Sequence, residues 1–374
     1  MSTGARPGAP AWINLAVLPA VNLAVALLLS AVVILLVGES PGKAMRILAA
    51  GAFGDAEAVG YTLYYATNFI FTGLAVAVAF HGGLFNIGAE GQAYLGGLGV
   101  ALLCLGAGSW PTALVITAAT LVAAAAGAAW AFVPGWLQAY RGSHVVITTI
   151  MFNFIAASVM TYLLVNVLIN PGQQSPETRE FAASTWMPQL HGALRAVGLE
   201  LGRSPLNLAL VLAVGAAVLV WFYLWHTRWG YELRALGHSP SAAVYGGISP
   251  ARTIVVAMAI SGALAGCMSL NEVMGVQHRL LLNMPGGAGY VGIAVALMGR
   301  NHPFGIVLAS ILFGALYQGG SELSFDMPKL TRDMVVVIQG LIILVCGALE
   351  HALSRPLESL LRAPGRAAAA AERA

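Results

Sequence analysis

Charged residues are the scarcest class in this sequence. They make up 9% of the chain, against 59% for hydrophobic residues, whereas ordinary soluble domains carry about 25% charged residues. So few charges cannot cover the surface of a water-soluble fold, which excludes the soluble globular class. The net charge of +3 is small and the basic residues are scattered through loops, so we expect neither nucleic-acid binding nor a polybasic lipid-binding patch.

Cysteines and catalytic signatures are also sparse. Cys104, Cys267 and Cys346 all lie within apolar runs and lack metal-ligand spacing, so we expect them to pack between helices. The sequence contains no Walker-type GxxxxGK[ST], no HExxH and no paired intramembrane aspartates. We therefore predict no metal site, no catalytic residues and no cofactor bound by this chain.

Long apolar runs, by contrast, recur along nearly the whole sequence. A helix needs roughly 20 apolar residues to cross about 30 Å of hydrocarbon. The first run is much longer than a signal-peptide core of about 7–15 residues, so we interpret it as a retained span. The pattern predicts an all-α, polytopic transmembrane helical bundle of about ten spans, at residues 13–37, 61–80, 84–105, 110–133, 145–169, 206–225, 253–274, 286–300, 303–320 and 333–350.

Two of these segments are weak. The run 84–105 is interrupted by Asn86, Glu90 and Gln92, and the run 286–300 is short and rich in glycine. Such segments are typical of broken or re-entrant helices that line a cavity in a transporter. They are third and eighth in the series, and a period of five spans inverts the second half. This spacing favours an inverted repeat.

The distribution of lysine and arginine predicts the topology. With the N-terminus inside, the positive-inside bias is mild. We predict a cytoplasmic tail at residues 1–12, a transmembrane domain at 13–350 and a second cytoplasmic tail at 351–374. The external loop 170–205 contains apolar residues among its polar ones, so we expect it to pack as a lid.

The loop 227–254 is the most polar predicted cytoplasmic stretch away from the ends. Ser239 is suited to cap a helix that begins at Pro240, and Gly246 with Gly247 is suited to end it. The sequence therefore predicts a short helix at about Pro240–Tyr245. Because so short a helix is marginal alone, it either packs on the protein's own helix ends or inserts into a groove of a cytosolic subunit.

Five motifs together resemble a known family. They are GLFNIGAEGQ at 83–92, VITTIMFNFIA at 146–156, GYELRALGHSPSAAVYGGI at 230–248, ISGALAG at 260–266 and GIAVALMGRNHPFGIVLA at 292–309. In order and spacing, over about residues 60–350, they resemble the membrane permease subunits of bacterial ATP-binding-cassette (ABC) importers. Within the group that also holds ribose and branched-chain amino acid permeases, they look like the nucleoside (guanosine-like) branch. His144 departs from the acidic residue of many relatives, so no role carries over to it.

The resemblance implies a function and partners. A nucleoside-like solute would be delivered by an external substrate-binding lipoprotein and would cross the bacterial inner (plasma) membrane, with both termini cytoplasmic. A second permease subunit, more often a different chain than a copy, would complete the pore. ATP and Mg would bind a separate cytosolic ABC ATPase, so this chain would not be an enzyme. The loop 227–254 would couple to that ATPase through Ser239, Pro240, Ser241, Ala242, Ala243, Val244, Tyr245 and Gly246.

Glu90 is the most conspicuous polar residue of the apolar runs. An ionised carboxylate in hydrocarbon costs at least about 2.5 kcal/mol, so Glu90 must face water or a partner, or be protonated. If residues 84–97 are helical, Asn86 and Glu90 lie one turn apart on one face. Either Glu90 accepts hydrogen bonds from the backbone, Asn68 or Asn153 and fixes helix positions, or it lines the substrate path.

Intramembrane amides accompany this carboxylate. We predict a substrate path that offers hydrogen bonds to sugar hydroxyls and base edges, formed by Asn68, Asn86, Glu90, Gln92, Asn153 and Asn271. Taken singly, the amides are equally suited to join helices. Tyr64, Phe85 and Tyr94 are candidates to stack on a base, or to pack between helices.

Other solutes and other classes of protein stay open. The same amides and acid suit a sugar or another small polar solute. A self-sufficient secondary transporter is less favoured, because intramembrane acids and bases for a proton relay are scarce. An intramembrane enzyme is disfavoured by the missing catalytic signatures.

Overall fold

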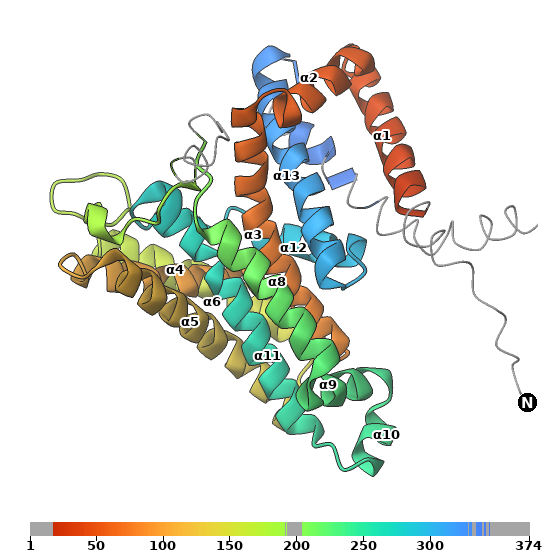
Figure 1. Ribbon diagram of the computed structural model, residues 1–374, viewed down its shortest axis with the longest axis vertical. Helices are drawn as coiled ribbons and strands as arrows, with labels where there is room; N and C mark the ends of the chain where they lie inside the picture. Colours follow the sequence, from red (N-terminus) through yellow and green to blue (C-terminus); the bar gives the residue numbers. More distant parts are fainter. Residues whose placement is uncertain are drawn as a thin grey trace, which may run out of the picture. The chain divides into compact units, whose positions relative to one another are not determined.

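The described part of the chain is helical. The computed structural model describes residues 18–190, 192, 204–327, 329–330, 334–338, 340–341 and 344, and the secondary structure of these residues is helix apart from two isolated β-bridges (Figure 1). The predicted all-α class is confirmed. The predicted tails at 1–12 and 351–374 lie outside the described residues, as does most of the predicted span 333–350.

The chain divides into two compact units, residues 1–47 with 320–374 and residues 48–319. The first unit contains α1 (Leu18–Leu36), the first part of α2 (Pro41–Phe53) and the last part of α13 (Pro303–Asp326). Within it, Lys329 Nζ lies 3.5 Å from a carboxylate oxygen of Glu39. This ion pair is exposed on the lysine side and contributes little to stability.

The second unit holds the remaining elements. They are α3 (Ala56–His81), α4 (Ala89–Gly106), α5 (Thr112–Arg141), α6 (Val145–Asn166), the 3-10 turn η2 (Ala183–Thr185), α8 (Ala209–His226), α9 (Arg228–His238), α10 (Pro240–Tyr245), α11 (Pro250–Cys267), the π-helix η3 (Leu270–Gln277), α12 (Ala288–Met298) and the first part of α13. η3 continues the direction of α11, so Pro250–Gln277 is a single apolar segment of 28 residues.

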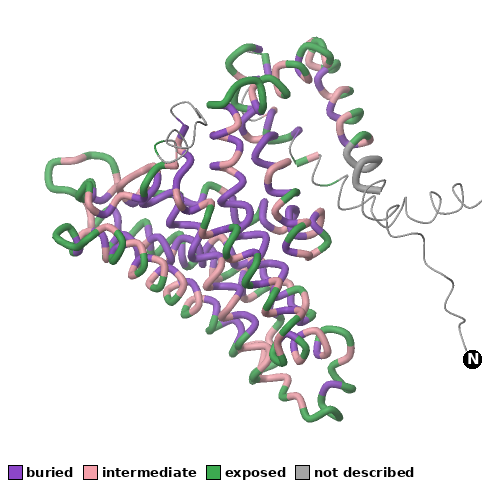
Figure 2. The backbone as a smooth tube through the Cα atoms, in the orientation of Figure 1, coloured by how far each residue is buried: buried purple, intermediate pink, exposed green. Residues whose placement is uncertain are grey.

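Helix α3 is the most buried element of the second unit. In its most apolar stretch, 83% of the residues are buried, and Figure 2 shows its backbone largely purple. α12 lies directly against it, because a Cβ built on Gly292 would come within 2.5 Å of Thr72 Oγ1. Helices α4, α8 and α11 also contact α3. The core of the unit is therefore formed around a helix that is buried on nearly all sides.

Helices α5 and α11 pack with their backbones in contact. A Cβ on Gly127 would lie 2.1 Å from the carbonyl oxygen of Gly262, and one on Gly262 would lie 2.3 Å from that of Gly127. One turn further along α11, a Cβ on Gly266 would lie 2.2 Å from the Ala123 oxygen. Only glycine fits at these crossings, as in other helix pairs packed within membranes.

The expected count of about ten spans is not confirmed. Six helices of the described residues are long and apolar enough to cross a membrane, namely Ala56–His81, Thr112–Arg141, Val145–Asn166, Ala209–His226, Pro250–Gln277 and Pro303–Asp326. Neither of the two segments predicted to be broken is among these six helices. Helix α4 begins only at Ala89, and the 11 residues of α12 extend about 16 Å, half the thickness of the hydrocarbon.

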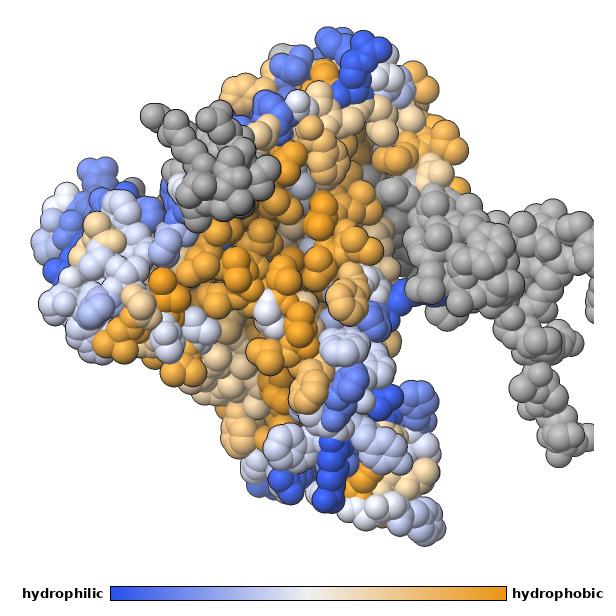
Figure 3. Space-filling model, in the orientation of Figure 1, coloured by the Kyte–Doolittle hydropathy of each residue, from blue (hydrophilic) through white to orange (hydrophobic). Residues whose placement is uncertain are grey.

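The surface of the second unit matches a membrane environment. Figure 3 shows apolar residues over its middle, and hydrophilic residues at the α9–α10 end and around the loop near residue 180. Large apolar side chains are exposed on its outer helices, including Leu121 (66%), Phe154 (64%) and Leu219 (69%). Exposure of this extent suits contact with lipid chains.

Candidate functional site

The carboxylate of Glu90 caps the N-terminus of α12. Glu90 lies in the first turn of α4, where its Oε1 accepts a hydrogen bond from Gly287 N at 2.7 Å and its Oε2 one from Gly289 N at 2.8 Å. A helix N-terminus presents unpaired N–H groups and partial positive charge, so it stabilises an anion. The bonds that Glu90 makes are thus to backbone donors.

The start of α12 touches the start of α4 at Gly289. A Cβ built there would lie 2.3 Å from Glu90 N and 2.6 Å from Glu90 Cα. The preceding Gly287 has φ +87°, a left-handed conformation that favours glycine. The glycines of the weak segment 286–300 therefore allow the close approach on which the carboxylate cap depends.

Asn86 lies outside α4, which corrects the expectation that it shares a helix face with Glu90. Residues 82–88 are turn and irregular backbone, and Gly88 is the N-cap of α4. Asn86 Oδ1 accepts a hydrogen bond from Gly88 N at 2.8 Å, an Asx-type turn that competes with helix. Its side chain is fully buried, whereas Glu90 is half-buried.

A first polar cluster joins Asn86, Gln92 and Ser261 at the start of α4. Asn86 Nδ2 donates to Gln92 Oε1 at 3.0 Å and to Ser261 Oγ at 2.8 Å. Ser261 on α11 in turn donates to the carbonyl oxygen of Ala75 on α3 at 2.6 Å. Sequence reasoning missed Ser261, because a serine in an apolar span gives no signal by itself.

Asn153 on α6 holds the same irregular segment from the other side. Its Oδ1 accepts from Gly91 N at 2.9 Å, while its Nδ2 donates to Ile87 O at 2.9 Å and to the Tyr290 hydroxyl at 3.3 Å. The two sequence-predicted residues Asn86 and Asn153 thus both stabilise the broken start of α4.

A second polar cluster surrounds Glu272, which sequence reasoning missed. Glu272 Oε1 accepts hydrogen bonds from the Tyr64 hydroxyl at 2.5 Å and from Asn68 Nδ2 at 2.6 Å. Asn271 Nδ2 donates to Asn68 Oδ1 at 2.8 Å and to Tyr64 O at 3.1 Å. Asn207 Nδ2 donates to Asn271 Oδ1 at 2.8 Å, so the loop before α8 joins the same cluster.

The π-helix places this second cluster. Asn271 and Glu272 lie in η3, and π-turns within helices are frequent at functional sites. In the sequence, the signal for this cluster was Glu272 itself, an acidic residue near the end of the predicted apolar span 253–274. The clusters contact α3 at Tyr64–Asn68 and at Ala75, seven or more residues apart, so they are separate layers about 10 Å apart along the helix.

The predicted stacking aromatics lie in different surroundings. The Tyr64 hydroxyl is bonded to Glu272, and Phe85 packs edge-to-face against Phe80 with ring centroids 6.3 Å apart. The Tyr94 hydroxyl accepts a hydrogen bond from Asn283 N. The structure does not gather these three rings around one cavity.

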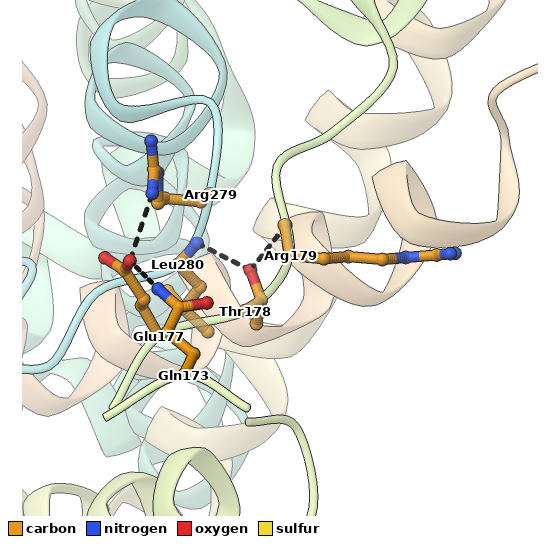
Figure 4. Close-up of polar contacts among 6 residues, drawn as sticks. All are labelled: Gln173, Glu177, Thr178, Arg179, Arg279 and Leu280. Atoms are coloured by element: carbon orange, nitrogen blue, oxygen red, sulfur yellow. Dashed lines mark hydrogen bonds and ion pairs between the residues drawn. The ribbon is translucent and has the colours of Figure 1, made fainter. Parts of the chain in front are cut away.

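The loop predicted to be a lid is packed, as Figure 4 shows. Arg279 Nη1 lies 3.0 Å from Glu177 Oε1, and Glu177 also accepts a hydrogen bond from Gln173. Thr178 N donates to Leu280 O at 3.1 Å, and Leu280 N donates to Thr178 Oγ1 at 3.0 Å. Residues 177–181 thus pair with the segment that follows η3, while 191 and 193–203 lie outside the described residues.

His278 adds an aromatic contact between the 170–205 loop and the segment that follows η3. Its ring stacks on Trp186 with centroids 3.9 Å apart and an interplanar angle of 15°. Burial lowers the pKa of His278 below its usual 6.5, against a smaller opposite effect from its hydrogen bond to Met274 O. The backbone of His278 is left-handed, with φ +52°, where the chain turns out of η3.

The short helix predicted at Pro240–Tyr245 is confirmed with those bounds as α10. Ser239 is its N-cap, and its side chain accepts a hydrogen bond from Ala242 N at 3.4 Å. Gly246 ends the helix, and Gly247 follows with φ +78°. Ala243 packs inward, whereas Val244 and Tyr245 are 55% and 95% exposed. One face of α10 therefore rests on the protein and the other is open.

Comparison with known proteins identifies the family. Residues 58–346 match the family described as branched-chain amino acid transport system / permease component. The guanosine ABC transporter permease protein NupP of Bacillus subtilis is 36% identical over 326 residues, covering 86% of this chain and 90% of that protein. The nucleoside ABC transporter permease protein NupB of Lactococcus lactis subsp. cremoris is 31% identical over 333 residues, covering 86% and 88%.

A third relative carries a different solute name. The glucose ABC transporter permease protein TsgB13 of Haloferax volcanii is 29% identical over 348 residues, covering 91% of this chain and 88% of that protein. No solved structure matches the chain. Because the family match covers most of its length, this chain belongs to the permease components of the branched-chain amino acid transport system family.

Proposed function

We propose that this chain is a membrane permease subunit of an ABC importer and forms the translocation path for a nucleoside-like solute. The observation that carries the proposal is the 36% identity to a guanosine permease over 86% of the chain. The buried amides and carboxylates of the second unit are suited to this role, because such groups pair with base edges and sugar hydroxyls.

The substrate path in this proposal is formed by the predicted residues together with Glu272. In the conformation described, these side chains bond mainly to one another and to the backbone. A solute that enters must therefore replace bonds within the protein, which favours weak binding and easy release. Tight capture then belongs to the external substrate-binding lipoprotein.

Energy for transport comes, in this proposal, from a separate cytosolic ATPase that binds ATP and Mg and contacts this chain at α10. The exposed Val244 and Tyr245 support this role, because they present an apolar and an aromatic side chain on a helix too short to be stable alone. We place the chain in a bacterial inner membrane with both termini cytoplasmic, beside a second, different permease. Closure of the ATPase would then move the two permeases as rigid bodies.

Uptake into proteoliposomes tests the proposal. We expect labelled guanosine to enter vesicles that contain this chain with its ATPase and second permease, only when ATP is supplied on the ATPase side and the binding protein on the other. Tyr245→Ala should reduce ATP-driven uptake several-fold, while Tyr231→Ala, at a tyrosine on α9 that is 63% exposed, serves as the control. Full uptake without an ATPase would contradict the proposal and favour a secondary transporter.

The solute is tested in the same vesicles by competition. The identity to a glucose permease makes a sugar the second candidate. We expect unlabelled nucleosides to compete with labelled guanosine, and glucose not to compete. Competition by glucose alone would reverse the assignment of the solute while leaving the importer intact.

A further inference from the structure

A cavity of about 370 Å³ lies between α8, α9 and α11, apart from both polar clusters. The residues that line it include Tyr223 of α8, Trp229 and Glu232 of α9, and Arg252, Val256 and Ile260 of α11. Neither the predicted substrate path nor the coupling residues of α10 include any of them. Trp229, Glu232 and Arg252 do belong to the loop 227–254, but the proposed coupling to the ATPase runs through residues 239–246 and leaves the cavity without a role.

The cavity is polar at one end and apolar at the other. Arg252 lies in the first turn of α11, and Ile260 lies eight residues later, about 12 Å further along the helix axis. The polar end is at the α9–α10 end of the unit, while Val256 and Ile260 belong to a segment apolar enough to span a membrane. Val256 and Trp229 are 40% and 61% exposed, so the cavity is accessible from the side.

The charge of the polar end is positive. Glu232 is already paired, because Arg228 Nε lies 2.8 Å from its Oε1. Arg252 is exposed and forms no ion pair with the residues that the structure describes. Because the charges of Arg228 and Glu232 cancel, the polar end keeps the one positive charge of Arg252. Trp229 and Tyr223 lie beside it, and tryptophan and tyrosine are enriched at membrane–water interfaces.

We propose that this cavity binds one anionic phospholipid, with its phosphate against Arg252 and the first part of one acyl chain along Val256 and Ile260. An occupant must combine a negative charge with an apolar chain of about 12 Å, and the bilayer supplies molecules of this form. Inorganic phosphate would leave the apolar part empty. The proposal is independent of which solute the permease carries.

Native mass spectrometry of the purified full-length chain tests the proposal. Phosphatidylglycerol and phosphatidylcholine of equal chain length are titrated separately into delipidated protein. We expect one phosphatidylglycerol to bind about fivefold more tightly, because one arginine near an anionic headgroup contributes about 1 kcal/mol. Arg252→Gln should remove this preference. Val256→Trp should fill the cavity and weaken the binding of both lipids.

Arg141→Gln is the matched control. Arg141 is an exposed arginine at the end of α5, which packs antiparallel to α11 and ends near its start, but it does not line the cavity. We expect this variant to bind phosphatidylglycerol as the unchanged protein does. Thermal unfolding is used to check that each variant is folded.

Three results would overturn the proposal. The first is an unchanged preference for phosphatidylglycerol in Arg252→Gln. The second is an equal loss of that preference in Arg141→Gln, which would indicate diffuse attraction. The third is displacement of the bound lipid by millimolar inorganic phosphate, which would indicate a site for the anion alone.

Discussion

At the residue scale, the two carboxylates of the proposed substrate path, Glu90 and Glu272, are both held by hydrogen-bond donors. Glu90 is bonded to two backbone N–H groups, and Glu272 to a tyrosine hydroxyl and an asparagine amide. An unpaired carboxylate in an apolar interior costs several kcal/mol, so each acid constrains the groups around it. These acids therefore contribute to the stability of the fold whether or not they contact solute.

Replacing Glu90 by glutamine should destabilise the protein. The glutamine amide group would face one of the two backbone N–H groups, leaving a buried donor unpaired at a cost of about 1–3 kcal/mol. Thermal unfolding in detergent measures the change. Glu57→Gln, at an exposed acid in the first turn of α3, should unfold like the unchanged protein. Equal melting temperatures for Glu90→Gln and Glu57→Gln would show that the α12 cap is unimportant.

Transport by the same variant separates the two roles left open for Glu90. If Glu90 lines the path, Glu90→Gln lowers uptake by more than the loss of folded protein explains, with normal insertion into the membrane. If it only fixes α12, uptake per folded molecule stays unchanged.

Two substitutions of Glu272 should differ in their effects. Glu272→Gln keeps an oxygen that can accept the bonds from Tyr64 and Asn68, whereas Glu272→Leu leaves both donors buried without a partner. We expect the leucine variant to lose about 2–5 kcal/mol of stability and the glutamine variant less than half as much. Urea unfolding of both variants measures this difference. If both lose the same amount, the negative charge and not the acceptor oxygen holds the cluster.

His278 should make the lid contact sensitive to acid. Burial lowers the pKa of His278 in the folded state, so the unfolded chain takes up a proton first as the pH falls below about 6.5. The neutral His278 ring therefore makes its full contribution to stability above pH 6.5, and this contribution is lost as the pH falls toward the lowered pKa of His278 in the folded state. Glu180 and Arg279 act on the ring with opposite signs.

Melting temperatures at pH 7.5 and 5.0 test the effect of His278. The decrease should be smaller in His278→Asn, because asparagine tolerates the left-handed backbone but does not titrate. An identical decrease in both proteins would place the acid sensitivity elsewhere.

The surroundings of individual polar residues were predicted less accurately than the helices that carry them. Asn86 was expected on the α4 helix, but its side chain bonds to Gly88 N and ends the helical pattern there. The asparagine followed by glycine two residues later was the signal for this turn. Glu272 was missed because the apolar residues around it gave the impression of an uninterrupted span. Which amides share a cluster depends on helix packing, which one sequence does not contain.

At the element scale, the residues that cap helices gave the most accurate predictions of helix ends. Serine, proline and glycine fix both ends of α10, and the structure reproduces them. The caps act within a few residues, so no knowledge of the rest of the fold is needed. The glycine contacts between α5 and α11 are the opposite case, since nothing in either helix alone identifies its partner.

A pair of glycine substitutions tests this helix contact. Gly262→Ala would place a methyl group against the backbone of α5 and should cost about 1–3 kcal/mol. Gly215→Ala on α8 meets no atom within 4 Å and should be neutral or slightly stabilising, because alanine favours helix. Thermal unfolding compares the two variants. Equal stability would mean that α5 and α11 separate at little cost.

At the scale of the whole molecule, the helical class and the family were predicted from the sequence, whereas the count of about ten spans is not confirmed by the described residues. Hydropathy counts apolar runs, and it does not distinguish a helix long enough to cross a membrane from one such as α12, which has only 11 residues. The orientation stays a prediction, because the positive-inside bias is mild.

Cysteine labelling would determine the orientation. Pro250–Gln277 extends about 42 Å and separates α10 from the lid contact at His278. In a background without Cys346, Tyr245→Cys should react with an impermeant maleimide only from the cytosolic side. Ala183→Cys, exposed in the lid, should react only from the outside. Labelling of both from one side would refute the predicted topology.

The cap at Glu90 has a mechanical consequence. Two hydrogen bonds and a backbone contact without spare room join the beginnings of α4 and α12. Neither short helix can slide past the other while that junction is intact. A conformational change that displaces α4 must therefore also move the start of α12, so the two helices are mechanically coupled and do not move independently.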